Sequence, residues 1–171
     1  MTVYTHIAQA EFVTAIRTLA AALATDEWKP DFIIGVGRGG LAPAVFLSHA
    51  TGLPMLSVDY SSQVKDFADA PLEKLAKRTQ DGELLLFIDD INDSGRTIGH
   101  LREKLGAGGA TDGSIRFATL IDNVSSSQRV DYRALTIDRR VTKDWFIFPW
   151  EAVAPDAAIA EDAAAVPERI A

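Results

Sequence analysis

The sequence predicts an α/β fold with a doubly wound, mainly parallel sheet, because short apolar runs alternate along the chain with stretches of helical periodicity. The 171 residues suffice for one such domain with a buried core. Ligands of these sheets bind beyond the carboxyl ends of the strands, where the strand order reverses. We therefore expect functional residues just after Val36, Asp59, Phe87 and Leu120.

Proline and glycine residues mark the ends of the predicted helices and strands in the first half of the chain. Pro30 divides the first helix from the first strand, and Pro43 lies in the first turn of the second helix, where proline is tolerated. Gly52 and Pro54 end that helix. The predicted elements are a helix over 7–24, a strand over 31–37, a helix over 41–50 and a strand over 55–59.

The second half begins with a polar loop over 60–70, which exceeds the usual length of a connection and is therefore either mobile or functional. The run over 83–89 is the most apolar strand of the chain. The predicted elements are a short helix over 71–79, this strand, a helix over 97–105 closed by glycines, and strands over 115–121 and 132–137.

Composition excludes several classes of function. With no cysteine, the chain has no disulfide, thiolate site or iron–sulfur cluster, and its three histidines lie too far apart in the sequence to predict a zinc site. A net charge of −7 argues against a general nucleic-acid coat. No segment approaches the roughly 20 apolar residues of a membrane helix, and the N-terminus lacks a secretory pattern. We therefore expect a cytoplasmic protein with no membrane or nucleic-acid partner.

The end of the chain differs from the rest. Residues 152–171 contain nine Ala and four acidic residues against one Arg. This tail is either a weakly structured or helical appendage or a helix that binds a partner, and the sequence does not decide between them.

The first segment with a chemical pattern is the glycine-rich turn from Gly35 to Gly40, which follows a strand and satisfies G-x-G-x-x-G. With Asp59 at the end of the next strand, it has the pattern of a dinucleotide-binding turn. Arg38 within the glycines could instead offer its charge to a diphosphate. A tight strand–helix turn with no ligand is the third interpretation.

The second segment runs from Leu84 to Thr97, LLLFIDDINDSGRT. An apolar strand delivers Asp89 and Asp90 at its carboxyl end, and a turn with hydroxyls and a glycine precedes a helix. Free amides at the helix start, with Ser94 and Thr97, suit a phosphate monoester. The two carboxylates suit the vicinal hydroxyls of a ribose, so this order of residues fits a sugar phosphate better than a solvated acidic turn.

The third segment, 143–151, contains four aromatic residues after the last strand. It is either part of the apolar core or a platform that stacks on a planar base.

These segments resemble the type I phosphoribosyltransferases. LLFIDDINDSGRT matches that family's motif for 5-phosphoribosyl 1-pyrophosphate (PRPP), and the segment 36–40 is similar to its pyrophosphate loop, in which a cis peptide often precedes the Arg. The loop 60–70 takes the place of the mobile catalytic loop. Trp145 and Pro149-Trp150-Glu151 resemble the hood of the xanthine–guanine (hypoxanthine) branch. The resemblance implies a domain over 1–151, with a core over about 26–138 and a hood from 1–8 and 139–151, followed by the tail over 152–171.

The resemblance also implies the reaction, in which a purine-type base (guanine, xanthine or hypoxanthine) displaces pyrophosphate from PRPP to give a nucleoside monophosphate. It implies magnesium as cofactor and a homo-oligomer, dimer or tetramer. The residues that it implies are catalytic Asp93 and Arg38; PRPP-binding Gly37, Arg38, Gly39, Asp89, Asp90, Asp93, Ser94, Gly95, Arg96 and Thr97; base-binding Asn123, Lys143, Trp145 and Phe146; and metal-binding Asp89, Asp90 and Glu151.

One position departs from the family pattern. Purine-salvage members place a Lys beyond the strand that matches 115–121, where it contacts the exocyclic oxygen of the base, whereas this chain has Asp122 and Asn123. Asn123 can donate a hydrogen bond there, and Lys143 could substitute from the hood. Two alternatives stay open: a non-catalytic regulatory protein of the same fold that binds PRPP or a nucleotide, and a dehydrogenase built on the Gly35–Gly40 turn.

Overall fold

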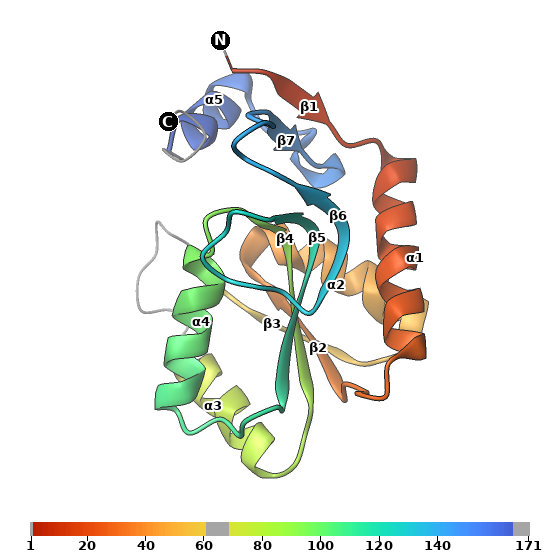
Figure 1. Cartoon of the computed structure of the whole chain (residues 1–171), viewed down its shortest axis with the longest axis vertical. Helices are drawn as coiled ribbons and strands as arrows, with labels where there is room; N and C mark the ends of the chain where they lie inside the picture. The colour runs from red at the N-terminus through yellow and green to blue at the C-terminus, as the bar shows by residue number, and fades with distance from the viewer. Residues whose placement is uncertain (1, 61–68, 166–171) are drawn as a thin grey trace.

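The computed structural model describes residues 2–60 and 69–165, and it confirms the predicted fold class (Figure 1). Strands and helices alternate along most of the chain. The elements are β1 Tyr4–His6, α1 Gln9–Thr25, β2 Phe32–Val36, α2 Gly37–Thr51, β3 Met55–Val58, α3 Asp69–Gln80, β4 Leu85–Asn92, α4 Arg96–Ala107, β5 Ile115–Asn123, β6 Tyr132–Ile137, β7 Trp145–Ile147, a 3-10 turn Pro149–Glu151 and α5 Asp156–Ala164. None of the helices described is long and apolar enough to cross a membrane.

The main sheet has five strands in the order β3-β2-β4-β5-β6, and every neighbouring pair is parallel. The chain order reverses between β2 and β4, because β3 adds to one side of β2 and β4 to the other. This is the switch point at which sheets of this type bind ligands. The carboxyl ends of β2 and β4, which carry the two predicted phosphate-binding segments, therefore meet at one place.

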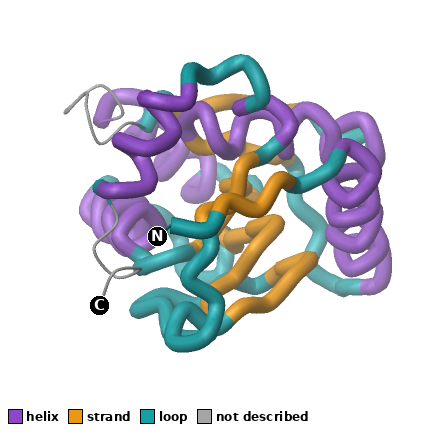
Figure 2. The backbone as a smooth tube through the Cα atoms, turned by 90° about the horizontal axis from the view of Figure 1, so that it is seen from above, coloured by secondary structure: helices purple, strands orange, loops and turns teal. Residues whose placement is uncertain are grey.

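Two apolar layers bury the sheet on both faces, with helices on either side (Figure 2). Side chains of β4 alternate between the layers: Leu86 and Ile88 pack toward α1 and α2, and Leu85 and Phe87 pack toward α3 and α4. All four are fully buried. Burial on both faces explains why this strand reads as a continuous apolar run in the sequence.

A second, two-stranded parallel sheet joins the start of the chain to the segment after β6, because β1 pairs with β7. The Trp145 amide donates to the Val3 carbonyl at 2.8 Å, and Thr5 Oγ1 donates to Asp144 Oδ2 at 2.5 Å. Just after β7 in the chain, the rings of Phe148 and Trp150 stack with their centroids 4.8 Å apart. Phe148 belongs to the apolar core and the partly buried Trp150 packs against it, so the core interpretation of 143–151 holds for these two aromatics.

Several element boundaries differ from those predicted. The glycine-rich turn is itself helical, so α2 begins at Gly37 instead of residue 41. β4 continues to Asn92 instead of ending at residue 89, because its pairing with β5 extends to Asp122. The peptide bond before Arg38 is trans, unlike the cis bond that the resemblance implied. Most of the expected catalytic loop, 61–68, lies outside the described residues.

Candidate active site

The glycine-rich turn packs closely against the neighbouring strand ends. Gly37 has a φ of +54°, and a Cβ atom there would collide with the carbonyl oxygen of Tyr60. A Cβ on Gly40 would collide with the Ile88 carbonyl oxygen, and one on Gly39 would meet the Asp90 carboxylate. The glycines therefore allow the start of α2 to touch β4. This contact leaves the Arg38 side chain exposed at the switch point.

Asp89 and Asp90 lie half-buried near the carboxyl end of β4. Each carboxylate accepts the backbone amide of the next residue, at 2.9 Å from Asp90 and 2.6 Å from Ile91. Burial raises the pKa of Asp89 to about 6. Burial, followed by the charges of Asp89 and Glu151, raises the pKa of Asp90 as well. Two adjacent carboxylates that resist ionisation together favour a cationic or hydrogen-bond-donating ligand.

Glu151 approaches these groups from the 3-10 turn after β7. Its Oε2 atom accepts the Phe148 amide at 2.8 Å, and burial is the main cause that raises its pKa. The charge of Asp162 on α5 raises this pKa further, while Arg38 lowers it. The structure thus brings Glu151, Arg38 and Asp90 within electrostatic reach. Within residues 2–60 and 69–165, however, no three acidic or histidine side chains lie close enough to form a metal site by themselves.

The turn between β4 and α4 has the geometry of an anion site. Gly95, at the N-cap position of α4, has a φ of +89° and carries no side chain that could cap the helix. Ser94 Oγ accepts the Arg96 amide at 3.3 Å and Arg96 Nε at 3.2 Å. Thr97 is half-buried in the first turn of the helix. Amides at a helix start, flanked by hydroxyls and a guanidinium, suit a phosphate group.

A serine-rich turn after β5, which the sequence did not predict to be part of the site, supports the anion site. The Ser127 amide and Oγ both donate to the Ser94 carbonyl, at 3.1 and 2.8 Å. Ser126 Oγ donates to Asn92 Oδ1 at 2.9 Å, and a Cβ on Gly95 would meet both serine hydroxyls. The position of this turn, at the carboxyl end of a parallel strand, is the only signal in the sequence.

The structure does not support the predicted contact between Asn123 and a base. Asn123 is 4% exposed, and its amide group is used within the protein. Nδ2 donates to the Asp93 carbonyl at 2.9 Å, while Oδ1 accepts the backbone amides of Ser125 and Arg139. Asn123 therefore holds three segments of the site together. Its neighbour Asp122 is also buried and accepts a hydrogen bond from Asn92.

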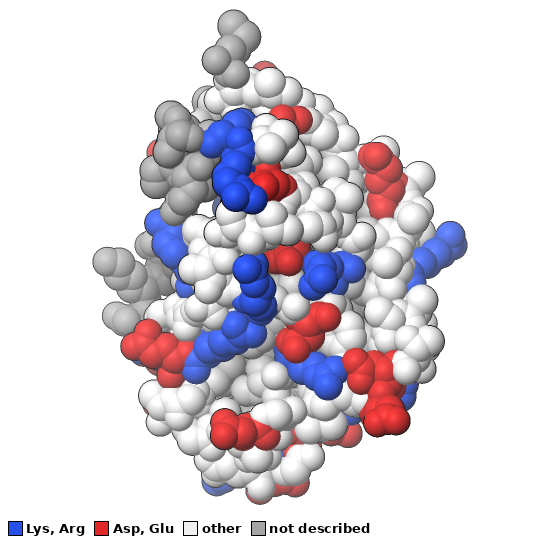
Figure 3. Space-filling model, in the orientation of Figure 1, with Lys and Arg blue, Asp and Glu red and all other residues white. Residues whose placement is uncertain are grey.

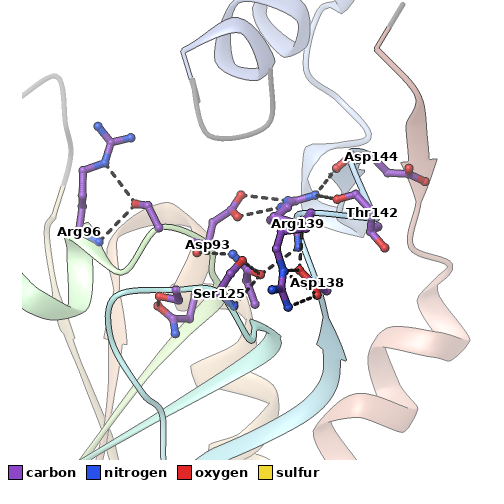
Figure 4. Close-up of polar contacts among 12 residues, drawn as sticks. Asp93, Arg96, Ser125, Asp138, Arg139, Thr142 and Asp144 are labelled. Carbon is purple, nitrogen blue, oxygen red and sulfur yellow. Dashed lines mark hydrogen bonds and ion pairs between the residues drawn. The ribbon is translucent and has the colours of Figure 1, made fainter. Parts of the chain in front are cut away.

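Arg139, two residues after β6, is a further site residue that the sequence did not predict (Figure 4). Its Nε and Nη2 atoms donate to the two carboxylate oxygens of Asp93, at 2.8 and 2.9 Å. Its Nη1 atom donates to the carbonyls of Thr142 and Asp144. A buried arginine thus stands between the anion-binding turn and the small sheet. Its place after a strand end was a signal, but the ion pair itself depends on tertiary structure.

Of the remaining predicted base-binding residues, Phe146 lies beside this arginine. Trp145 and Phe146 are half-buried in β7, and the Arg139 guanidinium lies 5.3 Å from the centre of the Phe146 ring. Lys143 is exposed in the segment before β7. Figure 3 shows acidic and basic side chains intermingled over one face of the molecule, so the charge that matters at the site is local.

The fold and the site together define a phosphoribosyltransferase: the chain belongs to this family, whose phosphoribosyl transferase domain matches residues 4–155. The match spans the glycine-rich turn, the Asp89–Thr97 segment and the small sheet. It removes the dehydrogenase interpretation of the glycine pattern, because the match to this family includes the same turn.

Individual members of the family are similar to this chain in sequence and in structure. The chain is 30% identical over 125 residues to a xanthine-guanine phosphoribosyltransferase of Idiomarina loihiensis, covering 70% of each chain. A purine phosphoribosyltransferase structure from Pyrococcus horikoshii is 29% identical, with a TM-score of 0.64 over 89% of this chain and 97% of that one. The xanthine-guanine-hypoxanthine phosphoribosyltransferase of Helicobacter pylori shares the fold at 20% identity, with a TM-score of 0.65 over 93% and 99% of the two chains.

Proposed function

We propose that this protein transfers the ribose-5-phosphate of PRPP to a purine-type base, guanine, xanthine or hypoxanthine, and releases pyrophosphate. The observation that carries the proposal is the β4–α4 segment, in which two half-buried carboxylates precede a helix start with glycine at its N-cap, at the switch point of the sheet. The carboxylates suit the ribose hydroxyls, and the helix start suits the 5-phosphate. The purine-specific relatives support the choice of base.

The proposed PRPP contacts follow the arrangement of the two turns. Asp89 and Asp90 accept hydrogen bonds from the ribose hydroxyls, and Asp93 lies beside the phosphate turn. The amides of Ser94, Gly95, Arg96 and Thr97 surround the 5-phosphate. Gly37, Arg38 and Gly39 lie at the start of α2, where the positive end of the helix and the exposed guanidinium suit the pyrophosphate.

Magnesium fits the donors of this site, because carboxylate oxygens and phosphates are its usual ligands. Asp89 and Asp90 would hold it together with oxygens of the substrate, and Glu151 would support the ion from the hood. Bound magnesium would neutralise charge on the pyrophosphate leaving group. The raised pKa values of all three carboxylates agree with a site that is completed by a cation.

The reaction breaks the bond between the anomeric carbon and pyrophosphate and forms a bond to a ring nitrogen of the base. Positive charge develops on the sugar in the transition state, so neutralising the leaving group lowers the barrier. Arg38, which is exposed at the start of α2, would do this. Asp93 is placed to hold or accept a proton from the base, and Trp145 and Phe146 would pack against its plane.

We also retain three wider proposals from the sequence. The chain forms a core, a hood that includes the β1–β7 sheet, and an Ala-rich tail that contains α5. It assembles as a homo-oligomer, and it acts in the cytoplasm without a membrane or nucleic-acid partner.

The direct test incubates the full chain with PRPP, magnesium and each of guanine, xanthine and hypoxanthine, and measures the release of pyrophosphate. We expect turnover with at least one base, and none for a variant with Asp89→Asn and Asp90→Asn. Absence of turnover with every nucleobase would contradict the proposal. Tight PRPP binding in that case would favour the regulatory alternative.

A further inference from the structure

Asp93 and Arg139 form the best-shielded ion pair with two hydrogen bonds in the described part of the site. The arginine side chain is 5% exposed and the aspartate side chain 16%. Two parallel hydrogen bonds of 2.8 and 2.9 Å fix the planes of the guanidinium and the carboxylate relative to each other. The carboxylate therefore cannot turn freely within the turn that precedes α4.

The guanidinium is fixed from its other side as well. Nη1 donates to the Asp144 carbonyl at 2.6 Å and to the Thr142 carbonyl at 3.2 Å, and the Arg139 amide donates to Asn123 at 3.0 Å. Arg139 thus connects the anion-binding turn, the end of β5 and the segment that leads to β7 (Figure 4). A ligand that lies between the turn and β7 meets the pair as a rigid unit.

The pair still has hydrogen-bonding capacity for a ligand. A guanidinium has five N–H donors, and the described residues accept four of them, which leaves the second N–H of Nη2. A carboxylate can accept about four hydrogen bonds, and Arg139 supplies two. The pair therefore offers one acceptor group and one donor group side by side, next to the Phe146 ring.

We propose that Arg139 is a specificity-determining residue of this site, and that with Asp93 it selects 6-oxopurines over adenine. This inference rests on the proposed function. A 6-oxopurine, as the free base or within its nucleotide, carries an N1–H next to its carbonyl oxygen, and it can present the N1–H to the carboxylate and the carbonyl oxygen to the guanidinium. Adenine presents an amino group to the guanidinium, so two donors would face each other without an acceptor. A site that leaves polar groups unpaired in this way discriminates strongly.

The test compares the binding of inosine and adenosine monophosphates by calorimetry, because the two products differ in the same exocyclic group. The wild-type chain should bind the inosine nucleotide at least about tenfold more tightly. Arg139→Gln, whose amide can donate or accept, should bring the two affinities to within about threefold. Arg139→Lys, which only donates, should keep the preference. Arg140→Gln is the matched control, since Arg140 is 75% exposed and pairs with Asp138.

The outcomes are separable. An unchanged preference in a folded Arg139→Gln variant would overturn the inference, as would a wild-type chain that shows no preference or binds neither nucleotide. If Arg139→Gln does not fold, the double variant with Asp93→Asn replaces it, because no buried charge is then left alone, and the same loss of preference is expected. Absence of turnover in the wild-type chain contradicts the proposed function, whereas the ratio of affinities still decides the role of Arg139.

Discussion

Replacing both carboxylates of β4, by Asp89→Asn with Asp90→Asn, should make the protein more stable while it removes PRPP binding. Burial holds the pKa of Asp89 at about 6, above its ordinary value of 3.8, and it also raises the pKa of Asp90. The folded chain therefore binds these protons more tightly than the unfolded chain. Above pH 6 Asp89 is ionised in the folded and in the unfolded chain, and the folded chain bears the cost of the buried charge.

The magnitude follows from the pKa of Asp89. A pKa of about 6 in place of 3.8 corresponds to about 3 kcal/mol. Because the carboxylate is only half-buried, water screens part of this cost, and we expect a gain of about 1 to 2 kcal/mol in the variant at pH 8. For a chain of this length, that gain raises the melting temperature by about 2 to 8 °C.

The sign of the pH dependence is fixed by the direction of the shift. In the wild-type chain the destabilising charge is absent below about pH 4, grows as the pH rises toward 6, and is complete above pH 6. The asparagines carry no charge at any pH. The difference in the free energy of unfolding between variant and wild type should therefore be near zero at pH 4 and largest at pH 8.

Chemical denaturation from pH 4 to pH 8 measures this difference, and thermal shift with magnesium and PRPP measures binding in the same samples. PRPP at a hundredfold excess over its Kd should stabilise the wild-type chain by about 2.7 kcal/mol and leave the variant unchanged. Asp112→Asn is the matched control, because this carboxylate is exposed and should change stability by less than about 0.5 kcal/mol. A variant that is less stable than the wild type at pH 8, or stabilised equally at every pH, would refute the reasoning.

Three further substitutions test the packing around the site. Trp150→Ala removes a ring stacked in the core and should cost about 3 kcal/mol in denaturant titrations, whereas Val153→Ala, at a side chain 92% exposed, should cost almost nothing. Gly40→Ala places a methyl group against the Ile88 carbonyl oxygen of β4 and should lower the melting temperature strongly. Gly52→Ala is the control, because a methyl group there meets open space and costs only about 1 kcal/mol for the positive φ. Equal decreases in melting temperature would contradict the packing described for Gly40. Ser127→Ala removes one hydrogen bond to the phosphate turn and should weaken PRPP binding about threefold by calorimetry, with unchanged affinity as the contrary result.

Local patterns in the sequence predicted most of the fold. The helical spacing of 7–24 and the apolar run of 83–89 correspond to α1 and β4, because burial of a helix stripe or of a two-sided strand leaves a direct mark on the sequence. The ends of elements were less predictable. β4 continues past its two aspartates because its neighbour β5 supplies hydrogen bonds, which no local pattern records.

In the candidate site, too, local sequence patterns were predictable and contacts between distant residues were not. The segments after β2 and β4 were found because glycines, hydroxyls and carboxylates stand together in sequence. The internal hydrogen bonds of Asn123 and the ion pair of Arg139 could not be predicted, because their partners lie 30 and 46 residues away in the sequence. The sequence alone showed that the lysine of the family pattern is absent at Asp122 and Asn123. That an arginine pairs with Asp93 became apparent only in the folded chain.

The central claim is that the chain moves ribose-5-phosphate from PRPP to a purine base. Phosphorus NMR of a reaction with PRPP, magnesium and hypoxanthine or guanine tests it most directly, because substrate, pyrophosphate and nucleoside monophosphate give separate signals. The account predicts pyrophosphate and nucleoside monophosphate in equal amounts, formed only when a base is present. Intact PRPP with every purine base, in samples where the protein is folded, would contradict it.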